Sequence, residues 1–583
     1  MFDIFYRKNN NKSLFESLED LENMNSTSLQ NYVPIYKNFF SLNDQNFNNI
    51  NLNHKYSIES LVKKYNHTSY NVKIKSEKNT INRDAFFKFS PLMDPIKYLS
   101  GKYENISKEK LLTLPKLNNK SHKKMLDINN SAYVDSFFSY LTSQVYHEHN
   151  FVHGLDFYGS FLCLQNKYII NIADDIEYLM ESKFFQEKRN ILFTLEDGAS
   201  ELFSETDSRT NKSKLTVNDD VKLDVSTIND ELYNNVFKLT EQNLNIHNNT
   251  NAKLEYVADV SSNEKANTES SESTCSSRES KTDGSKSSSD SVKSYTGSDT
   301  SCDYSNSIDE ILECKINEFP VQIICLEKME NTLDSLLGDE FSDEDEDEEL
   351  EEDSIDSIVE ELTDDEWRSL LFQIIMTLLT YQKMFDFTHN DLHTNNIMYN
   401  KTDKKFLYYK YNNIYYKVPT YGKIYKIIDF GRAIYKFKDT IICSDSYHPK
   451  GDAATQYNCE PYFNKDKPRL LPNKSFDLCR LGCALYDYFL EDLEDPKVVI
   501  NPIGKLIKEW CSDDKGKNIL YKTNGEERYP DFKLYKMIAR TVHKHTPESQ
   551  LEKGIFFKFQ TSKKKIGKKK KFMNIDELPV YFN

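Results

Sequence analysis

The chain has 583 residues, a formal net charge of −17, and 29% charged against 38% hydrophobic residues. This acidic balance argues against nucleic-acid binding by the chain as a whole, and no apolar stretch approaches the roughly 20 residues that a membrane span requires. Ten cysteines without a C-x-x-C pair, and a start that lacks a basic segment followed by an apolar one, predict a soluble intracellular protein with reduced thiols.

Strand patterns dominate the first part of the chain. Residues 1–55 are rich in Asn and weakly patterned, and we expect an N-terminal extension there. Alternation over Tyr70–Lys75, followed by a polar turn and apolar Ala85–Phe89, predicts a β-hairpin. Apolar residues at helical spacing over 131–147 predict a helix, and Phe157–Ile172 predicts a second pair of strands.

Two stretches have a composition that opposes folding. A Ser/Asp/Asn-rich segment over about 205–315 and an acidic segment over about 339–360 are predicted to be disordered insertions. The acidic segment is expected to be a solvated loop, with docking of basic partners as the alternative. Between them lies an apolar strand, Val321–Leu326. The Lys-rich cluster Lys563–Lys571 favours either a solvated tail, a nuclear address or an anionic-surface contact, and it is the exception to the argument against nucleic acid.

An amphipathic helix over Asp364–Phe387 leads into the stretch His389–Asn396, which reads H-N-D-L-H-T-N-N. Asp391 and Asn396 lie five residues apart on this predicted loop. The carboxylate can accept the proton of an attacking hydroxyl, and the amide oxygen can hold a metal ion, so the pair is suited to chemistry at a phosphate.

Three further residues occupy positions that the same chemistry needs. Asp429 begins a D-F-G tripeptide at the end of an apolar strand, where a carboxylate can chelate Mg²⁺. Asp477 opens an apolar helix within Ser475–Gly482. Lys88 lies on the predicted strand Ala85–Phe89, although most strand lysines are simply exposed.

Together these motifs resemble the protein kinase superfamily, and most closely the divergent serine/threonine-protein kinases of large nucleocytoplasmic DNA viruses. The resemblance covers roughly residues 60–200 and 320–545. It implies an α+β, bilobal protein-kinase-like fold with a small β-rich N-lobe and a larger, mainly helical C-lobe. The N-lobe and hinge would occupy 56–330, the C-lobe 331–545, and a C-terminal tail 546–583.

The resemblance also implies a role for each residue. Asp391 would be the catalytic base, Asn396 and Asp429 would hold Mg²⁺ with Mn²⁺ as the alternative ion, and His389 and Asp477 would support the loop. Lys88 would position the phosphates of ATP and pair with Asp135, although the family normally has Glu at that position. The remaining ATP contacts would come from the hinge and from a phosphate turn, formed by Leu326, Glu327, Met329, Asn66, His67, Thr68 and Ser69.

The sequence also departs from the family pattern at other positions. No glycine precedes Gly101, so the phosphate turn lacks the glycines that let a backbone approach phosphate closely. Asn390 stands where the family has Arg, and His393 where it has Lys. We expect an active kinase acting on Ser or Thr of protein substrates in the host cytoplasm or virion. The alternatives are a pseudokinase scaffold and a small-molecule kinase of the choline or aminoglycoside type.

Overall fold

The computed structural model describes residues 2–9, 11–20, 24–118, 121–195, 312–337, 361–490, 501–567 and 570–582, and these residues form a mixed α+β fold. The acidic segment at 339–360 lies outside the described residues, as does the Ser/Asp/Asn-rich segment apart from 312–315. Within the described part of the chain, no helix is long and apolar enough to cross a membrane.

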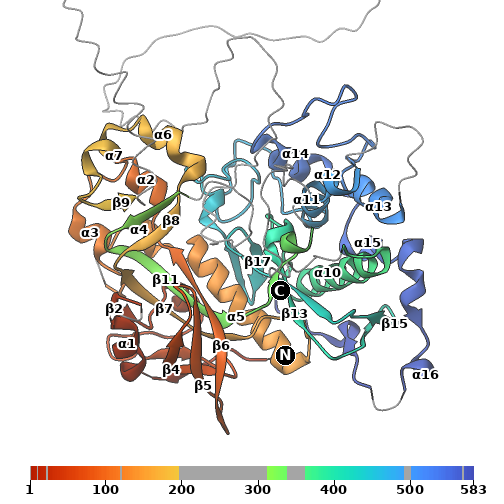
Figure 1. Ribbon diagram of the computed structural model, residues 1–583, viewed down its shortest axis with the longest axis horizontal. Helices are drawn as coiled ribbons and strands as arrows, with labels where there is room; N and C mark the ends of the chain where they lie inside the picture. Colours follow the sequence, from red (N-terminus) through yellow and green to blue (C-terminus); the bar gives the residue numbers. More distant parts are fainter. Residues whose placement is uncertain are drawn as a thin grey trace, which may run out of the picture. The chain divides into compact units, whose positions relative to one another are not determined.

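The largest sheet has six antiparallel strands in the order β2-β7-β11-β6-β5-β4 (Figure 1). Strands β5 and β6 form the predicted hairpin, which places Lys88 of β6 opposite Ile324 of β11. The six strands are β2 (Ser26–Gln30), β4 (Ser57–Lys64), β5 (Ser69–Lys75), β6 (Thr80–Pro91), β7 (Phe157–Gln165) and β11 (Phe319–Glu327).

Residues 1–55 contribute to this sheet and are not separate from it. β2 pairs with β7, and the preceding helix α1 (Lys12–Glu19) buries Leu14 and Leu18. β1 (Tyr6–Lys8) pairs with β3 (Ile50–Leu52), which brings the beginning and the end of this segment together. Many apolar residues of this Asn-rich stretch, such as Tyr32, Val33 and Ile35, are buried by tertiary contacts.

One boundary of the predicted insertion was wrong. Residues 313–315 belong to β10 (Glu313–Ile316), which pairs with β8 (Tyr168–Asn171) and β9 (Phe193–Leu195). The alternating sequence E-C-K-I buries Cys314 and Ile316 completely, which is the burial pattern of a strand. The predicted strand pair over 157–172 is accordingly divided between two sheets.

Helix α5 (Ser131–His149) contacts β7 and β11 of the six-stranded sheet (Figure 1). The side chain of Asn130 caps its first turn by accepting from the N–H of Ala132 at 3.1 Å. Shorter helices surround this region: α2 (Pro95–Leu99), α3 (Lys108–Leu112), α4 (Lys123–Leu126), α6 (Ile176–Met180) and α7 (Lys183–Lys188).

The second half is organised around α10 (Asp364–Phe385), whose first turn is closed by a capping box between Thr363 and Glu366. The chain leaves the helix at Asp386 in a left-handed conformation, one residue before the predicted end. The residues that follow form strands of two small sheets and a set of helices: β13 (Ile397–Lys401), β16 (Lys423–Ile427), β17 (Ile434–Phe437), β18 (Thr440–Cys443), α11 (Phe476–Ala484), α12 (Tyr486–Leu490), α13 (Pro502–Trp510), α14 (Lys533–Thr541) and α15 (Pro547–Gln550). β12 (Asn331–Thr332), which precedes α10 in the chain, pairs with β13.

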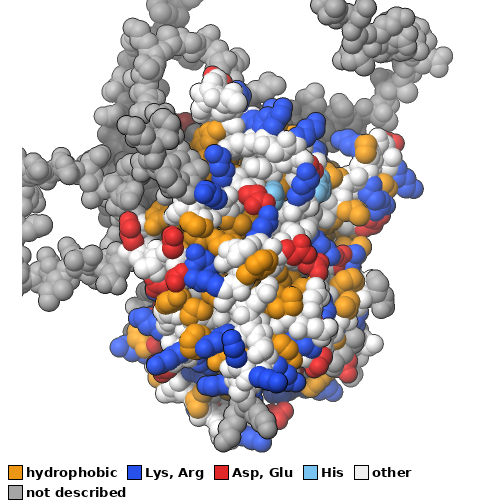
Figure 2. Space-filling model, turned by 90° about the vertical axis from the view of Figure 1, so that its right-hand side faces the viewer, with side chains coloured by type: hydrophobic (Ala, Val, Ile, Leu, Met, Phe, Trp, Pro, Cys, Tyr) orange, Lys and Arg blue, Asp and Glu red, His pale blue; other side chains and the backbone are white. Residues whose placement is uncertain are grey.

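The C-terminal segment packs against the fold. β19 (Gln560–Thr561) and β20 (Met573–Asn574) extend the pair β14 (Phe406–Tyr411) and β15 (Ile414–Pro419) into a four-stranded sheet, and α16 (Lys563–Ile566) lies between them in sequence. The hydroxyl of Tyr581 accepts from the N–H of Phe2 at 2.7 Å, which joins the two ends of the chain. On the face in Figure 2, basic, acidic and apolar side chains are interspersed.

Candidate active site

Asp477 supports the His389–Asn396 loop from below. It lies at the start of α11, fully buried, and accepts the backbone N–H groups of His389 at 3.0 Å and Asn390 at 2.8 Å. The His389 ring continues this support, because Nε2 lies 2.8 Å from the carbonyl oxygen of Ile428 and Nδ1 accepts the N–H of Asp391 at 3.2 Å. The backbone around Asp391 is therefore held on both sides.

Asn396 is oriented by its own loop. Its Nδ2 lies 2.9 Å from the carbonyl oxygen of Asp391, to which it donates, and 3.0 Å from Nε2 of His393. Burial lowers the pKa of His393 to about 4, so the ring is neutral near pH 7 and Nε2 can accept. Since Nδ2 makes both bonds, Oδ1 of Asn396 is the atom left as an acceptor, and no described residue donates to it.

Lys88, Asp135 and Asp429 form a compact ionic cluster. The Lys88 Nζ lies 2.9 Å from Oδ2 of Asp135 on α5 and 2.7 Å from Oδ2 of Asp429. Asp135 also accepts the N–H of Phe430 at 3.0 Å. Burial opposes the charged form of Asp429, but the nearby Lys88 outweighs it and lowers the pKa of Asp429 to about 2. On Asp135 the same effect of burial outweighs the nearby Lys88 and raises its pKa. The fold thus brings together three residues that are far apart in sequence.

Two residues of the site have a left-handed backbone that only glycine adopts without strain. Asp429 has φ +58° and Asn390 has φ +68°. Such conformations cost about 1 kcal/mol or more each and persist where surrounding contacts enforce them. The bonds from Lys88 to Asp429 and from Asp477 to Asn390 are contacts of that kind, so the strain lies at the positions that would carry the chemistry.

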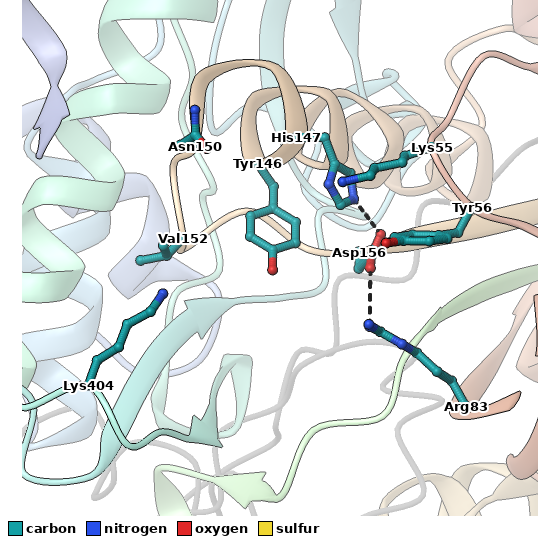
Figure 3. Close-up of a pocket in the computed structure, with 9 residues that line it drawn as sticks. All are labelled: Lys55, Tyr56, Arg83, Tyr146, His147, Asn150, Val152, Asp156 and Lys404. Carbon is teal, nitrogen blue, oxygen red and sulfur yellow. Dashed lines mark hydrogen bonds and ion pairs between the residues drawn. The ribbon is translucent and has the colours of Figure 1, made fainter. Parts of the chain in front are cut away.

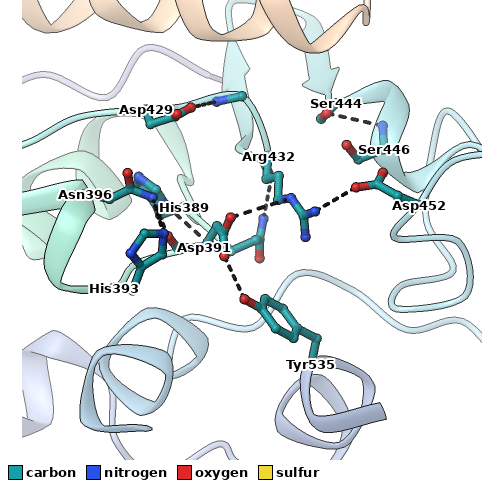
Figure 4. A network of polar contacts seen from close by, with 12 residues as sticks. His389, Asp391, His393, Asn396, Asp429, Arg432, Ser444, Ser446, Asp452 and Tyr535 are labelled. Carbon is teal, nitrogen blue, oxygen red and sulfur yellow. Dashed lines mark hydrogen bonds and ion pairs between the residues drawn. The ribbon is translucent and has the colours of Figure 1, made fainter. Parts of the chain in front are cut away.

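Sequence reasoning missed three residues near Asp391: Tyr535 and Arg432 contact its carboxylate (Figure 4), and Arg480 lies behind Tyr535. Tyr535 donates its hydroxyl to Oδ1 at 2.8 Å, and Arg432 Nε lies 3.6 Å from Oδ2. Arg480 donates to the Tyr535 hydroxyl at 2.9 Å. Burial alone would raise the pKa of Asp391, but Arg432, the neighbouring His393 and Arg480, and the Tyr535 hydrogen bond together lower it.

Two of these three residues carried a sequence signal. Arg432 directly follows D-F-G, and Arg480 lies three residues after Asp477, on the same face of α11. Tyr535 carried none, because it comes from α14, which no motif connects with the loop.

Asn390, which stands where the family has Arg, links the loop to the segment after D-F-G. Its Oδ1 accepts from the Tyr457 hydroxyl at 2.7 Å, and its Nδ2 donates to the carbonyl oxygen of Arg432 at 3.1 Å. Both of these partners of the Asn390 side chain are uncharged at the contact. This connection therefore needs no phosphate group to form.

The predicted phosphate turn is built differently from the catalytic loop. Oδ1 of Asn66 accepts the N–H groups of Thr68 at 3.0 Å and Ser69 at 2.7 Å, and the carbonyl oxygen of His67 accepts from Tyr70. The turn adjoins the strand of Lys88, because the N–H of Phe87 donates to Thr68. Its location agrees with the prediction, but the Asn66 side chain is used to close the turn.

The predicted hinge is also engaged in internal bonds. The Glu327 N–H donates to the carbonyl oxygen of Asp156 at 2.9 Å. The Glu327 carboxylate accepts from the Asp156 N–H at 2.7 Å, from Lys426 Nζ at 2.5 Å and from Asn400 Nδ2 at 2.7 Å. Leu326 and Met329 are buried on either side of it. The Glu327 N–H is thus used within the protein, and the predicted adenine contacts by the other backbone groups around Glu327 and Met329 stay a prediction.

A cavity of about 270 Å³ lies beside this hinge, and none of the predicted site residues lines it (Figure 3). At its wall, Asp156 pairs with His147 at 2.7 Å and with Arg83 at 3.7 Å. Its lining consists of Lys55, Tyr56, Arg83, Tyr146, His147, Asn150, Val152, Asp156 and Lys404.

The residues at the phosphate end suit one type of metal site. In the part of the chain that the structure describes, no group of three or more His, Cys, Asp or Glu residues could hold a metal ion by itself. Mg²⁺ in phosphate-transfer sites needs no such group, because one or two protein oxygens act together with phosphate oxygens. The Asp429 carboxylate and the free Oδ1 of Asn396 fit that requirement.

Comparison with known proteins shows partial similarity. No family model matches the chain. It is 40% identical over 178 residues to an uncharacterized protein of Invertebrate iridescent virus 6, which covers 30% of this chain and 26% of that protein. It is 35% identical over 103 residues to a probable serine/threonine-protein kinase of Dictyostelium discoideum, which covers 17% of this chain and 8% of that protein. The chain thus matches about a quarter or less of these relatives, and the second match gives a weak indication of the kinase superfamily.

Proposed function

We propose that this chain is a protein kinase that transfers the γ-phosphoryl group of ATP to Ser or Thr hydroxyls of protein substrates. In this proposal the six-stranded sheet and α5 form the smaller lobe of a bilobal fold, and α10–α15 lie in the larger. The ionic cluster of Lys88, Asp135 and Asp429 carries the proposal, because it links the sheet, α5 and the D-F-G segment at one point. The partial similarity to a probable serine/threonine-protein kinase supports it.

The exposures within the cluster assign a different role to each carboxylate. The Asp135 side chain is 5% exposed and that of Asp429 is 22% exposed. Asp135 also accepts from Phe430, so it would hold Lys88 in place. Asp429 is the carboxylate that a cation can reach, and with Oδ1 of Asn396 it would hold Mg²⁺. Bound there, Mg²⁺ would neutralise charge on the β- and γ-phosphates. Lys88 would contact the phosphates beside it.

Asp391 would receive the acceptor hydroxyl. An ionised carboxylate offers about four lone-pair sites; Tyr535 uses one on Oδ1 and Arg432 forms an ion pair at 3.6 Å with Oδ2, so sites remain for a substrate hydroxyl. The lowered pKa of Asp391 makes it a weak base. Phosphoryl transfer through a loose transition state asks little of a base, so the main contribution of Asp391 would be to orient the hydroxyl in line with the phosphorus.

A second candidate is a scaffold that keeps the fold without transfer. The observations that favour it are the use of the Asn66 side chain to close its own turn and the use of the Glu327 N–H by Asp156. Both remove groups that would otherwise bind nucleotide. The ion pairs of Asp391 and Asp429 with Arg432 and Lys88 can also stabilise a fold that does not transfer phosphate.

Transfer of label from γ-labelled ATP to a mixture of protein acceptors tests the proposal. We expect transfer by the full chain with Mg²⁺, and its loss by at least about 100-fold in Asp391→Asn and in Asp429→Asn. Asp386→Asn is the matched control, since it makes the same change at a residue that pairs with Lys436 and Lys474 outside the site. Equal transfer by wild type and Asp391→Asn would contradict the proposal.

Thermal denaturation with and without Mg-ATP separates the two candidates. An active kinase is stabilised by the nucleotide, because a ligand that binds only the folded state raises the midpoint. Stabilisation without transfer to any acceptor would identify a nucleotide-binding scaffold. Absence of both would leave a scaffold that does not bind nucleotide.

A further inference from the structure

Tyr535 lies between a buried arginine and the proposed catalytic carboxylate. Its hydroxyl donates to Oδ1 of Asp391 at 2.8 Å and accepts from Nε of Arg480 at 2.9 Å. Tyr535 is 4% exposed, and Asp391 and Arg480 are each 7% exposed. The three side chains come from α14, the catalytic loop and α11, and nothing in the proposed transfer step uses Tyr535 or Arg480.

The direction of the hydrogen bonds along this chain is set by chemistry. An arginine can only donate and an ionised carboxylate can only accept, so the phenol must accept from Arg480 and donate to Asp391. Burial raises the pKa of Tyr535, which keeps its hydroxyl protonated near pH 7. Donation from a charged guanidinium to the phenol oxygen strengthens the bond that the hydroxyl gives to Asp391.

Packing fixes the Tyr535 ring. Phe532 stacks on it with ring centroids 5.4 Å apart, and Phe476 lies at 6.0 Å. The guanidinium groups of Arg480 and Arg432 lie 5.3 and 6.0 Å from the centre of the ring. A ring held by two aromatic rings and two cations does not swing away without breaking these contacts. The Tyr535 hydroxyl is therefore held in place beside Asp391 and does not move aside to expose the carboxylate.

We propose that Tyr535 is a positioning residue for Asp391: its hydroxyl, held by Arg480, fixes the rotation of the carboxylate so that the remaining lone pairs face the acceptor hydroxyl. This inference rests on the proposed kinase function. Tyr535 touches neither ATP nor the acceptor and acts only through Asp391. It fixes the side chain of Asp391, whereas Asp477 and His389 fix the backbone beneath it.

Tyr535→Phe removes the hydroxyl and keeps the ring, so it tests the inference with little change in packing. We expect kcat for phosphoryl transfer to fall on the order of 10-fold, since a hydrogen bond to a charged group is lost, and KM for ATP to stay within about twofold. The matched control is Tyr409→Phe, which removes an equally buried hydroxyl that bonds to His153. It should leave kcat unchanged, and a comparable fall in kcat there would overturn the inference.

A readout without catalysis keeps this inference separable from the proposed function. In urea denaturation we expect Tyr535→Phe to lower the midpoint of the wild-type chain and to have less effect in an Asp391→Ala background, because the hydrogen bond is already absent. If the two substitutions are coupled in this way but the wild-type chain is inactive, the Tyr535–Asp391 contact is supported and the proposed kinase function is contradicted. An active wild type whose kcat is unchanged by Tyr535→Phe, or equal effects in both backgrounds, would overturn the positioning role alone.

Discussion

The two ends of the candidate site use their polar groups in different ways. Around Asp391 and Asp429, side chains are braced by neighbours yet keep acceptor atoms open, as Oδ1 of Asn396 does. Around Glu327 and Asn66, the side-chain oxygens accept hydrogen bonds from backbone N–H groups of the protein itself. If the proposed function holds, the end around Asp391 and Asp429 keeps acceptor atoms available for substrate, whereas the end around Glu327 and Asn66 uses its polar groups for stability.

Removal of Lys88 should give the largest effect, because it takes the cation from two buried carboxylates at once. Lys88→Met leaves Asp135 and Asp429 as two close carboxylates without their cation, and we expect a loss of about 3–5 kcal/mol in the free energy of unfolding. Label transfer should fall by about 100-fold or more. Lys97→Met, at a half-exposed ion pair with Asp94, is the control and should cost under about 1 kcal/mol. Equal costs in the two variants would show that the cluster is not a structural centre.

Acidification should lower the free energy of unfolding through protonation of His153. This ring is fully buried, lies 2.7 Å from both the Tyr425 carbonyl oxygen and the Tyr409 hydroxyl, and has its pKa lowered to about 4 by burial. Its unfolded-state pKa is near 6.5, so the unfolded chain binds the proton more readily. The contribution of His153 to stability should be full above pH 6.5 and should fall by about 3 kcal/mol as the pH drops from 6.5 to 4.

Urea denaturation across that range measures the effect of His153. A His153→Gln variant keeps a polar side chain that does not titrate, so it should lose that part of the pH dependence. The same slope in wild type and variant would assign the pH dependence to other groups.

Loss of the carboxylate beneath the loop should have a smaller effect, confined to the phosphate end. Asp477→Asn replaces one accepting oxygen by an NH₂ group that faces a backbone N–H, and we expect a loss of roughly 2–3 kcal/mol by chemical denaturation. Transfer should fall with it, while stabilisation by Mg-ATP should persist. Full activity in Asp477→Asn would mean that His389 alone holds the loop.

Removal of the turn-closing side chain should have the smallest effect. Asn66→Ala deletes the acceptor of the Thr68 and Ser69 N–H groups and should cost about 1 kcal/mol. It should weaken Mg-ATP binding, measured by titration calorimetry, only a few-fold, because Asn66 already bonds within its own turn. A large loss of affinity would show that Asn66 contacts the nucleotide directly and would remove the contrast between the two ends.

The sequence predicted the hairpin of Lys88 well, because strict alternation of polar and apolar residues leaves one register that buries Val72 and Ile74. It predicted α10 to within two residues, since an acidic first turn and a long apolar face are local signals. It did not predict that β2 joins the main sheet or that Glu313–Ile316 is a strand. Those strands are short, and their partners are distant in sequence.

The residues with chemical potential were visible in the sequence because their spacing is local: Asp391 and Asn396 share one loop, and Asp429 ends one strand. That Lys88 pairs with both Asp135 and Asp429, that Tyr535 and Arg480 hold Asp391, and that Asp156 takes the Glu327 N–H were decided only by tertiary structure. The physical reason is that motifs record short-range geometry, whereas the charge and hydrogen-bond partners of a buried group come from whichever elements pack against it.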